Sequence, residues 1–218
     1  MSTERWVKYT GNPVLGGELG TCFDMSVDVT DAGLHRMWFS WRPRRGIGYA
    51  ESEDGLHWTA RDDVVLGRDA TRPAESIEVT RPYVHAEDGH LTMWYAAHGE
   101  RSVVIARATS ADGIEWKRAG VVLEPTLPWE KAALMCPSVL RDGDGRFHMW
   151  YSGGERYEPD AIGYATSLDG VAWTRVSDEP VLRPGPPGSW ESDRVAGAHV
   201  FRDGDWLYAA YIGFANGF

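Results

Sequence analysis

The chain has 218 residues, of which 43% are hydrophobic, and its 22 Lys and Arg against 32 Asp and Glu give a net charge of −10. This balance disfavours nucleic acid as a partner, because binding to phosphates needs clustered cations. It accommodates a neutral or cationic ligand more easily than a polyanion, and solubility alone also explains the charge.

The compartment is inferred from the first residues and the cysteines. Residues 1–10 contain no apolar stretch of the kind a secretory signal needs, and no apolar run in the chain reaches the roughly 20 residues that span a bilayer. Cys22 and Cys136 are too few for a disulfide framework. We therefore expect a cytoplasmic protein with two free thiols and no membrane partner, although a secreted protein that has lost its signal would look the same.

The chain begins with a segment at 6–15 that matches 173–182 and therefore predicts an outer strand. Short strands are then expected at 25–27, 37–39 and 47–50. They lead into the turn Ser52-Glu-Asp54-Gly55-Leu-His-Trp58, in which Asp-Gly favours a tight turn and the Trp begins another strand. A strand at 64–66 closes this first unit.

The same pattern recurs twice more and begins a fourth time. The Asp residues of the turns, Asp54, Asp112 and Asp169, are 58 and then 57 residues apart. The fourth copy has strands expected at 198–200 and 207–211 around Asp203-Gly204, but no third strand with its Asp-Gly turn follows them. A repeat of this length is typical of propeller blades.

Four short antiparallel strands in each unit predict an all-β fold, a β-propeller with about three and a half blades. A β-sandwich also has evenly spaced strands, but it does not repeat its sequence unit by unit. We expect a single propeller domain over residues 1–218, incomplete at its C-terminal end. A fragment of a five-bladed protein is favoured over a compact ring with one short blade.

The repeated motifs resemble those of a known group of enzymes. The Ser-x-Asp-Gly-x-x-Trp turns, the Met-Trp-Tyr strands, the Asn-Pro-Val-Leu segment at 12–15 and the Trp-Glu pairs at 129–130 and 190–191 carry the resemblance. They resemble the five-bladed superfamily of arabinanases, invertases and levansucrases, with glycoside hydrolase families 32, 43 and 62 and the mannoside phosphorylases of family 130 nearby. The resemblance implies a small-molecule or oligosaccharide substrate in an axial pit.

The resemblance also implies two carboxyl groups that flank a glycosidic bond, one a general acid and the other a base or nucleophile. Asp24 matches the family position of the base or nucleophile, although Met25 replaces the Pro of the motif. Arg81 occupies the equivalent place in the second unit. Met135 and Ala196 stand where related families carry the acid Glu, so the usual acid is missing.

Each unit carries a Glu five residues before the reference position of its inner strand (Phe23, Thr80, Met135 or Ala196), and we predict that one of them replaces the missing acid. The four are Glu18, Glu75, Glu130 and Glu191, with Glu130 and Glu191 as the catalytic candidates beside Asp24. The alternative is that they are framework residues that satisfy backbone N–H groups, because residues that recur in every unit are usually structural.

Residues near the inner strands are the candidates for substrate binding. We predict this role for Arg81, Glu75, Tyr83, Cys136, Arg194 and His199, with Glu78 and Asp193 nearby. Arg81 either pairs with a carboxylate of the protein or binds a substrate carboxylate or phosphate. Cys136 is otherwise a small buried apolar residue, and His199 is either a core residue or a general acid or base.

The sequence thus favours a glycosidase-like propeller that acts on a carbohydrate at the axial pit. A non-catalytic glycan-binding or scaffold propeller is one alternative, and an enzyme acting on a small non-glycan metabolite is another. No Cys and His spacing typical of a metal site is present, and no cofactor is expected. Ca²⁺ in the axial channel is implied only by the resemblance. The sequence leaves the oligomeric state open.

Overall fold

The first unit is a small antiparallel sheet. The computed structural model describes residues 7–215, and in this range every regular element is a strand or a short 3-10 turn. After the turn η1 (Gly17–Leu19) the sheet runs in the order β1-β2-β3-β4, and β5 also pairs with β3. Its elements are β1 (Cys22–Val29), β2 (His35–Trp41), η2 (Arg42–Arg44), β3 (Gly46–Ser52), β4 (Thr59–Ala60) and β5 (Leu66–Gly67).

The second and third units repeat this arrangement. The second contains η3 (Pro73–Glu75), β6 (Glu78–Glu87), β7 (His90–His98), β8 (Val103–Ser110) and β9 (Lys117–Leu123). The third contains η4 (Pro128–Glu130), β10 (Ala133–Arg141), β11 (Phe147–Gly154), β12 (Ala161–Ser167) and β13 (Trp173–Arg175). A single parallel pairing of Ala133 with Val103 joins the two units into one sheet. The fourth unit is the antiparallel hairpin β14 (Arg194–Asp203) and β15 (Trp206–Phe214).

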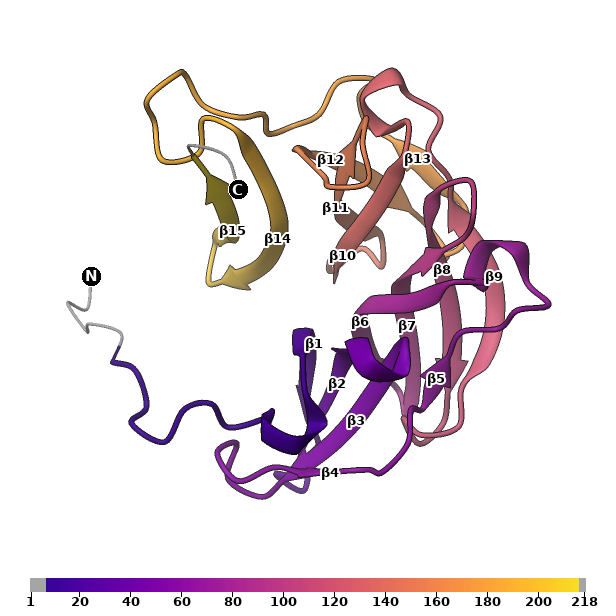
Figure 1. Cartoon of the computed structure of the whole chain (residues 1–218), viewed down its shortest axis with the longest axis vertical. Helices are drawn as coiled ribbons and strands as arrows, with labels where there is room; N and C mark the ends of the chain where they lie inside the picture. Colours follow the sequence, from indigo (N-terminus) through magenta and orange to yellow (C-terminus); the bar gives the residue numbers. More distant parts are fainter. Residues whose placement is uncertain (1–6, 216–218) are drawn as a thin grey trace.

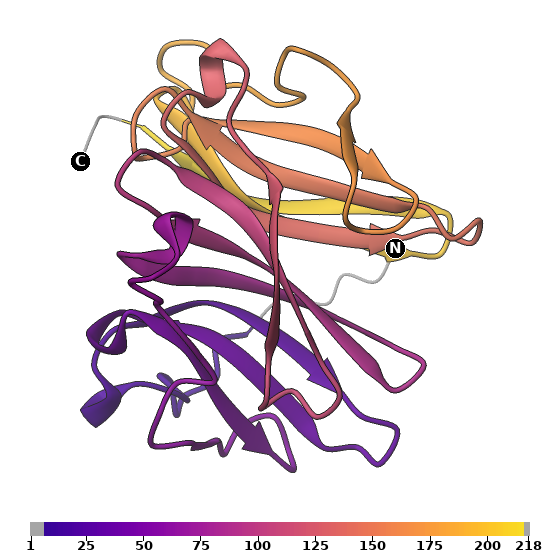
Figure 2. The same ribbon diagram turned by 90° about the vertical axis from the view of Figure 1, so that its right-hand side faces the viewer.

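The units are arranged around an axis, with the inner strands β1, β6, β10 and β14 closest to the centre (Figure 1). Seen from the side, the first three units stack as twisted sheets, with the β14–β15 hairpin against the third (Figure 2). The predicted fold class is confirmed: the described chain is all-β and its antiparallel units are placed like the blades of a propeller. The total of five blades stays a prediction.

The Asp-Gly turns form as predicted. In the first, Ser52 Oγ accepts a hydrogen bond from the backbone N–H of Gly55 at 2.9 Å, and Asp54 Oδ1 accepts those of Leu56 and His57 at 2.8 Å each. Trp58 Nε1 closes the turn by donating to the Gly55 carbonyl at 3.0 Å. The turns after β8 and β12 have the same contacts, which explains why Ser, Asp, Gly and Trp recur together.

Neighbouring units are held together by buried polar contacts as well as by apolar packing. The hydroxyl of Ser26 in β1 accepts the N–H of Val84 in β6 at 3.0 Å, and Ser138 in β10 accepts that of Val200 in β14 at 2.9 Å. In the first two units the Trp of the second strand also reaches across to the next unit, with Trp38 Nε1 donating to the Gly113 carbonyl at 2.8 Å and Trp94 Nε1 to the Gly170 carbonyl at 3.0 Å. These contacts fix the inner strands relative to one another.

The prediction of an outer strand at residues 6–15 is wrong for the part that the structure describes. Trp6 lies outside the described residues, and the part from residue 7 to residue 15 forms no strand. In the second and third units the outer strand pairs with a third strand, β9 with β8 and β13 with β12. The fourth unit has no third strand among residues 7–215, so the strand with which this segment would pair is absent from the described chain.

Candidate functional site

The inner strands share a bulge at one height. The pairing register breaks after Phe23 in β1 and at the matching places in β6, β10 and β14. The residue at each break has a left-handed backbone: Asp24 (φ 44°), Arg81 (φ 55°), Cys136 (φ 52°) and Gly197 (φ 64°). Positive φ is uncommon for residues other than Gly and collects at functional sites, where a bulge re-aims a side chain. The bulges therefore mark the candidate site.

The bulges are supported from the neighbouring units. The backbone N–H of Arg81 donates to Ser40 Oγ at 2.7 Å, and that of Gly197 donates to Ser152 Oγ at 2.9 Å. Ser40 lies in β2 and Ser152 in β11, and each of these strands is the second strand of the preceding unit. A bulge removes ladder hydrogen bonds, so these hydroxyls satisfy amides that would otherwise be unpaired.

Arg81 lies at the centre of the site. Its Nε is 3.0 Å from Asp24 Oδ2, and its side chain is 17% exposed against 40% for Asp24. Nε makes no hydrogen bond, so the contact is an ion pair without hydrogen-bond geometry. Burial opposes the charge on Arg81, but nearby Cys136 and Asp24 outweigh it and raise the pKa of the guanidinium. Burial raises the pKa of the Cys136 thiol to about 11.

A continuous chain of polar contacts leads from this ion pair to the rim of the site. Arg81 Nη1 donates to Thr80 Oγ1 at 3.4 Å, and Thr80 Oγ1 lies 2.7 Å from His98 Nε2. His98 Nδ1 lies 3.1 Å from the hydroxyl of Tyr157, which donates to Glu78 Oε1 at 3.4 Å. The chain connects two carboxylates, Asp24 and Glu78, through one buried histidine.

His98 is neutral in this chain. Its side chain is 2% exposed, and burial, with the Arg81 charge, lowers its pKa to about 3. Tyr157 gives its single proton to the Glu78 carboxylate, so His98 Nδ1–H donates to Tyr157. His98 Nε2 then accepts from Thr80, which itself accepts from Arg81. All hydrogen bonds therefore run in one direction, from Arg81 to Glu78.

The structure brings together a second pair of predicted residues further along the inner strands. The rings of Tyr83 on β6 and His199 on β14 lie 6.3 Å apart between centroids. Burial raises the pKa of Tyr83 to about 12, which keeps its hydroxyl protonated at neutral pH. Both residues lie two positions after the bulge of their strand, so they form a layer next to Arg81 and Cys136.

Two of the predicted glutamates make the contacts of framework residues. Glu130 is fully buried and accepts hydrogen bonds from Tyr151 at 2.6 Å, from Arg175 at 2.7 and 2.8 Å, and from two backbone amides. Burial would raise the pKa of Glu130, but these bonds outweigh it and lower the pKa. Glu75 is held in the same way by Tyr95 at 2.8 Å and Arg118 at 2.6 Å. The geometry favours the framework alternative for both residues.

Glu191 and Arg194 lie in the fourth unit, and none of their recorded contacts reaches Arg81. Glu191 Oε2 accepts from Tyr211 at 2.5 Å, which repeats the Tyr–Glu pair of the other units. The guanidinium of Arg194 lies over the ring of Phe214 at 4.7 Å from its centroid. The catalytic role of Glu191 and the binding role of Arg194 stay predictions.

Sequence reasoning missed several polar residues of this face, among them His98, Tyr157 and Asp160. Tyr157 and Asp160 lie in the loop 155–160 between β11 and β12, which is longer than the loop 42–45 of the first unit. Burial, with the charge of Glu155, raises the pKa of Asp160, and three nearby arginines oppose this. The extra length of this loop is the feature of the sequence that could have pointed to Tyr157 and Asp160, because a departure from the repeat marks a candidate for function.

The described residues do not fit the axial Ca²⁺ that the resemblance implies. No group of three or more His, Cys, Asp or Glu side chains suited to a metal ion exists in residues 7–215. Ca²⁺ takes six to eight oxygen ligands, whereas Arg81 already places a buried cation beside Asp24. Nor does any helix between residues 7 and 215 have the length and apolarity to cross a membrane.

Sequence comparisons relate the chain to curated bacterial proteins, while no family model matches it. It is 32% identical over 176 residues to a 1,2-β-oligomannan phosphorylase of Thermoanaerobacter sp., covering 79% of this chain and 53% of that protein. It is 30% identical over 165 residues to an uncharacterised protein of Mycobacterium tuberculosis, covering 69% and 52%. The chain thus spans about half the length of the curated relatives it matches.

Solved structures share the fold. The β-1,2-mannobiose phosphorylase of Listeria innocua superposes with a TM-score of 0.69 at 16% identity, over 96% of this chain and 71% of that one. The structural neighbours include GH130 mannoside phosphorylases and other glycosidases. The resemblance to the wider propeller group is therefore supported on the side of family 130, while membership of families 32, 43 or 62 stays a prediction.

Proposed function

We propose that this chain forms the axial site of a carbohydrate-active enzyme that cleaves a glycosidic bond. The observation that carries the proposal is the buried Arg81 between two residues of neighbouring inner strands, Asp24 and Cys136, each at a strained bulge. A fixed cation beside a half-exposed carboxylate suits a polar, hydroxyl-rich ligand. The names of the related phosphorylases support a mannoside as the first substrate to test.

Asp24 is the carboxylate proposed to act on the substrate. Its side chain is 40% exposed, so a ligand can reach it, and its Oδ2 lies 3.0 Å from Arg81 Nε. This suits a base or nucleophile rather than a proton donor. Glu130 is not needed in this role, because its oxygens are already occupied by Arg175 and Tyr151.

The second carboxyl group that faces the substrate is proposed at the other end of the polar chain. Glu78 is joined to Arg81 through Tyr157, His98 and Thr80, and its side chain is 21% exposed. A bound sugar hydroxyl that displaces Tyr157 from Glu78 would bring the substrate within reach of this carboxyl group. Hydrolysis uses water as the acceptor, whereas phosphorolysis uses inorganic phosphate and gives a sugar 1-phosphate.

Purified chain and β-1,2-mannobiose, with and without inorganic phosphate, test the proposal through release of mannose or mannose 1-phosphate. We expect Asp24→Asn to lower the rate at least 100-fold, as loss of a catalytic proton-transfer group does. Glu87→Gln, outside the site on the far end of β6, is the matched control and keeps the rate. Full activity of Asp24→Asn would show that Asp24 has no catalytic role.

The same ion pair favours a second candidate, a glycan-binding propeller without turnover. Arg81 is paired with Asp24 in the absence of ligand. A carboxylate paired in this way can still accept hydrogen bonds from sugar hydroxyls, but it is less available as a base or nucleophile. In that case a glycan array gives binding that Arg81→Met removes, and no product forms with or without phosphate. Product formation that depends on Asp24 decides for the enzyme.

A further inference from the structure

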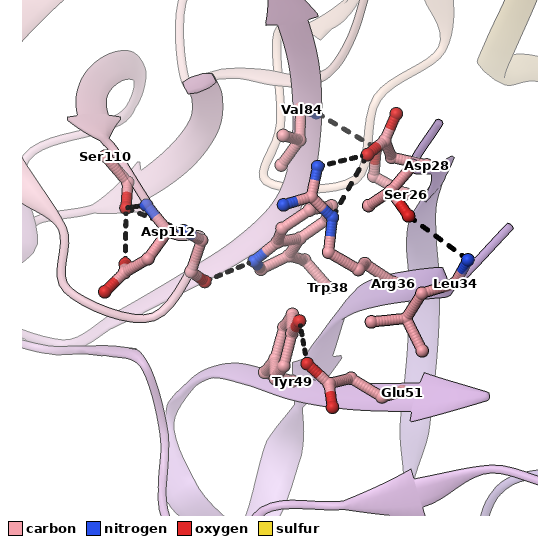
Figure 3. A network of polar contacts seen from close by, with 12 residues as sticks. Ser26, Asp28, Leu34, Arg36, Trp38, Tyr49, Glu51, Val84, Ser110 and Asp112 are labelled. Carbon is pink, nitrogen blue, oxygen red and sulfur yellow. Dashed lines mark hydrogen bonds and ion pairs between the residues drawn. The ribbon is translucent and has the colours of Figure 1, made fainter. Parts of the chain in front are cut away.

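The second strand of each of the first three units carries a tryptophan, and in the first two units the Asp-Gly turn of the next unit covers it. We call the position of this tryptophan a socket. The pairing register places Trp38, Trp94 and Trp150 at the same position, opposite Ser26, Tyr83 and Ser138. Trp38 Nε1 donates to the carbonyl of Gly113, and Trp94 Nε1 donates to that of Gly170 at 3.0 Å. Figure 3 shows the first socket, with Trp38 beside the turn of Ser110 and Asp112.

Only glycine fits at the contact point of the turn. Gly113 has φ +83°, and a Cβ placed there would lie 2.7 Å from Cζ2 of Trp38. Gly170 has φ +70°, and its Cβ would lie 2.9 Å from Cζ2 of Trp94. The Asp-Gly turn therefore lies directly against the indole, and the two tryptophans are 0% and 1% exposed.

The third socket has no turn on it. Trp150 is partly exposed, and its Nε1 donates no hydrogen bond to another group within residues 7–215. A cavity of about 270 Å³ lies beside it, lined by Trp150, Tyr164 and Leu207 among others. Tyr164 stacks on Trp150 at 5.0 Å, as Tyr49 packs on Trp38 at 5.5 Å. Leu207 takes the place of Leu91, which lines the first socket next to Gly113.

The strand beside this socket also has a free edge. In the first three units the second strand pairs with a third strand, but within the described chain β15 pairs with β14 alone. Large apolar side chains are exposed along β15, with Trp206 at 71%, Leu207 at 49% and Ile212 at 51%. An unpaired edge with exposed apolar residues is a place where a strand can be added.

The charge of the socket suits the acidic turn. Arg141 and Arg202 line the cavity, together with one acidic residue, Asp142. In the second socket Arg107 lies close enough to the turn residue Asp169 for their charges to interact. A turn whose Asp is held ionised by backbone N–H groups would meet Arg202 in the third socket.

We infer that the face formed by Trp150, Tyr164, Leu207 and the free edge of β15 binds a polypeptide segment of one kind: a short β-strand followed by a Ser-x-Asp-Gly-x-x-Trp turn. The strand adds to β15 and the turn glycine lies on Trp150, whose indole N–H donates to its carbonyl. This site is on a different part of the propeller from the axial residues Asp24 and Arg81.

A synthetic peptide with the sequence of residues 161–175, which carries such a strand and turn, tests the inference by titration against the whole chain. We expect saturable binding that weakens about fivefold or more when Trp150→Phe removes the indole N–H of the protein, as loss of one hydrogen bond does. The same peptide with Gly170→Ala is expected to bind at least tenfold more weakly, because its Cβ would clash with the indole. Trp58→Phe in the protein, in the Asp-Gly turn of the first unit and with no contact to the cavity beside Trp150, is the control and leaves the affinity unchanged.

Because a free peptide loses conformational entropy when it binds, a second measurement attaches the same segment behind residue 218 through a flexible Gly-Ser linker, which raises its effective concentration. We expect a higher Tm for this chain than for the one with the Gly170→Ala form of the segment. Failure of both the titration and the attached segment overturns the inference. So does a dimer of the unmodified chain that Trp150→Arg dissociates, or a mannoside that competes at Trp150, because each shows a different occupant.

Discussion

Nε of Arg81 lies 3.0 Å from Oδ2 of Asp24, so the inner strands of the first two units meet in an ion pair at the axis. The two residues occupy the same position of the repeat and share a left-handed backbone. Cys136 of the third unit is the next member of this set, and both charges act on its thiol. The state of this thiol therefore reports on the ion pair.

Substitutions of the pair should shift the reactivity of Cys136 in opposite directions. Arg81 lowers the pKa of Cys136 and Asp24 raises it, against the larger effect of burial. We expect Arg81→Met to slow alkylation by iodoacetamide at pH 9 and Asp24→Asn to speed it, each by up to about tenfold, since the thiolate reacts. Rates measured in a Cys22→Ser background isolate Cys136. Equal alkylation rates in the two variants would show that the charges of Arg81 and Asp24 do not affect the Cys136 thiol.

His98 should make stability depend on pH. Its folded pKa of about 3 lies below the ordinary 6.5, so between these values the unfolded state binds more protons and stability falls as pH falls. From pH 7.5 to pH 5 this costs about 2 kcal/mol. Urea unfolding at the two pH values measures the loss, and His98→Gln should show a loss smaller by that amount. An unchanged pH dependence in the variant would contradict a neutral, buried His98.

Glu130→Gln distinguishes a framework residue from a catalytic one. The change leaves Arg175 without its buried carboxylate, and we expect a loss of about 3 kcal/mol in the free energy of unfolding. Below the Tm, activity per folded molecule should stay within about twofold, because the residue is not at the substrate. Glu75→Gln, which loses the matching contact with Arg118, should behave alike. A stable but inactive Glu130→Gln would instead restore the catalytic prediction.

Gly113→Ala tests the packing of turn on tryptophan. The left-handed backbone costs an Ala about 1 kcal/mol, and the contact of its Cβ with Trp38 should bring the total to about 3 kcal/mol. Gly89→Ala is the matched control, because Gly89 has φ +74° but no atom within 4 Å of the added Cβ. Urea unfolding of both variants gives the difference that belongs to the contact. Equal losses of unfolding free energy in the two variants would mean that Trp38 makes room for the added Cβ without destabilising the fold.

The sequence alone determined the repeat and therefore the fold class. Strands and Asp-Gly turns depend on local alternation and on a few residues with special backbone preferences, and these recur visibly at 52–58, 110–116 and 167–173. The candidate positions Asp24, Arg81, Cys136 and His199 also followed from the sequence, because they break the repeat at the inner strands.

Only the tertiary structure decided which of these residues meet. Glu130 and Glu75 fit an acid in sequence position, but folding places Arg175 and Arg118 against them from distant outer strands. His98 and Tyr157 are 59 residues apart and gave no local pattern, yet they join Arg81 to Glu78. Contacts between units arise from the packing of whole sheets around an axis, so no local rule of spacing could reveal them.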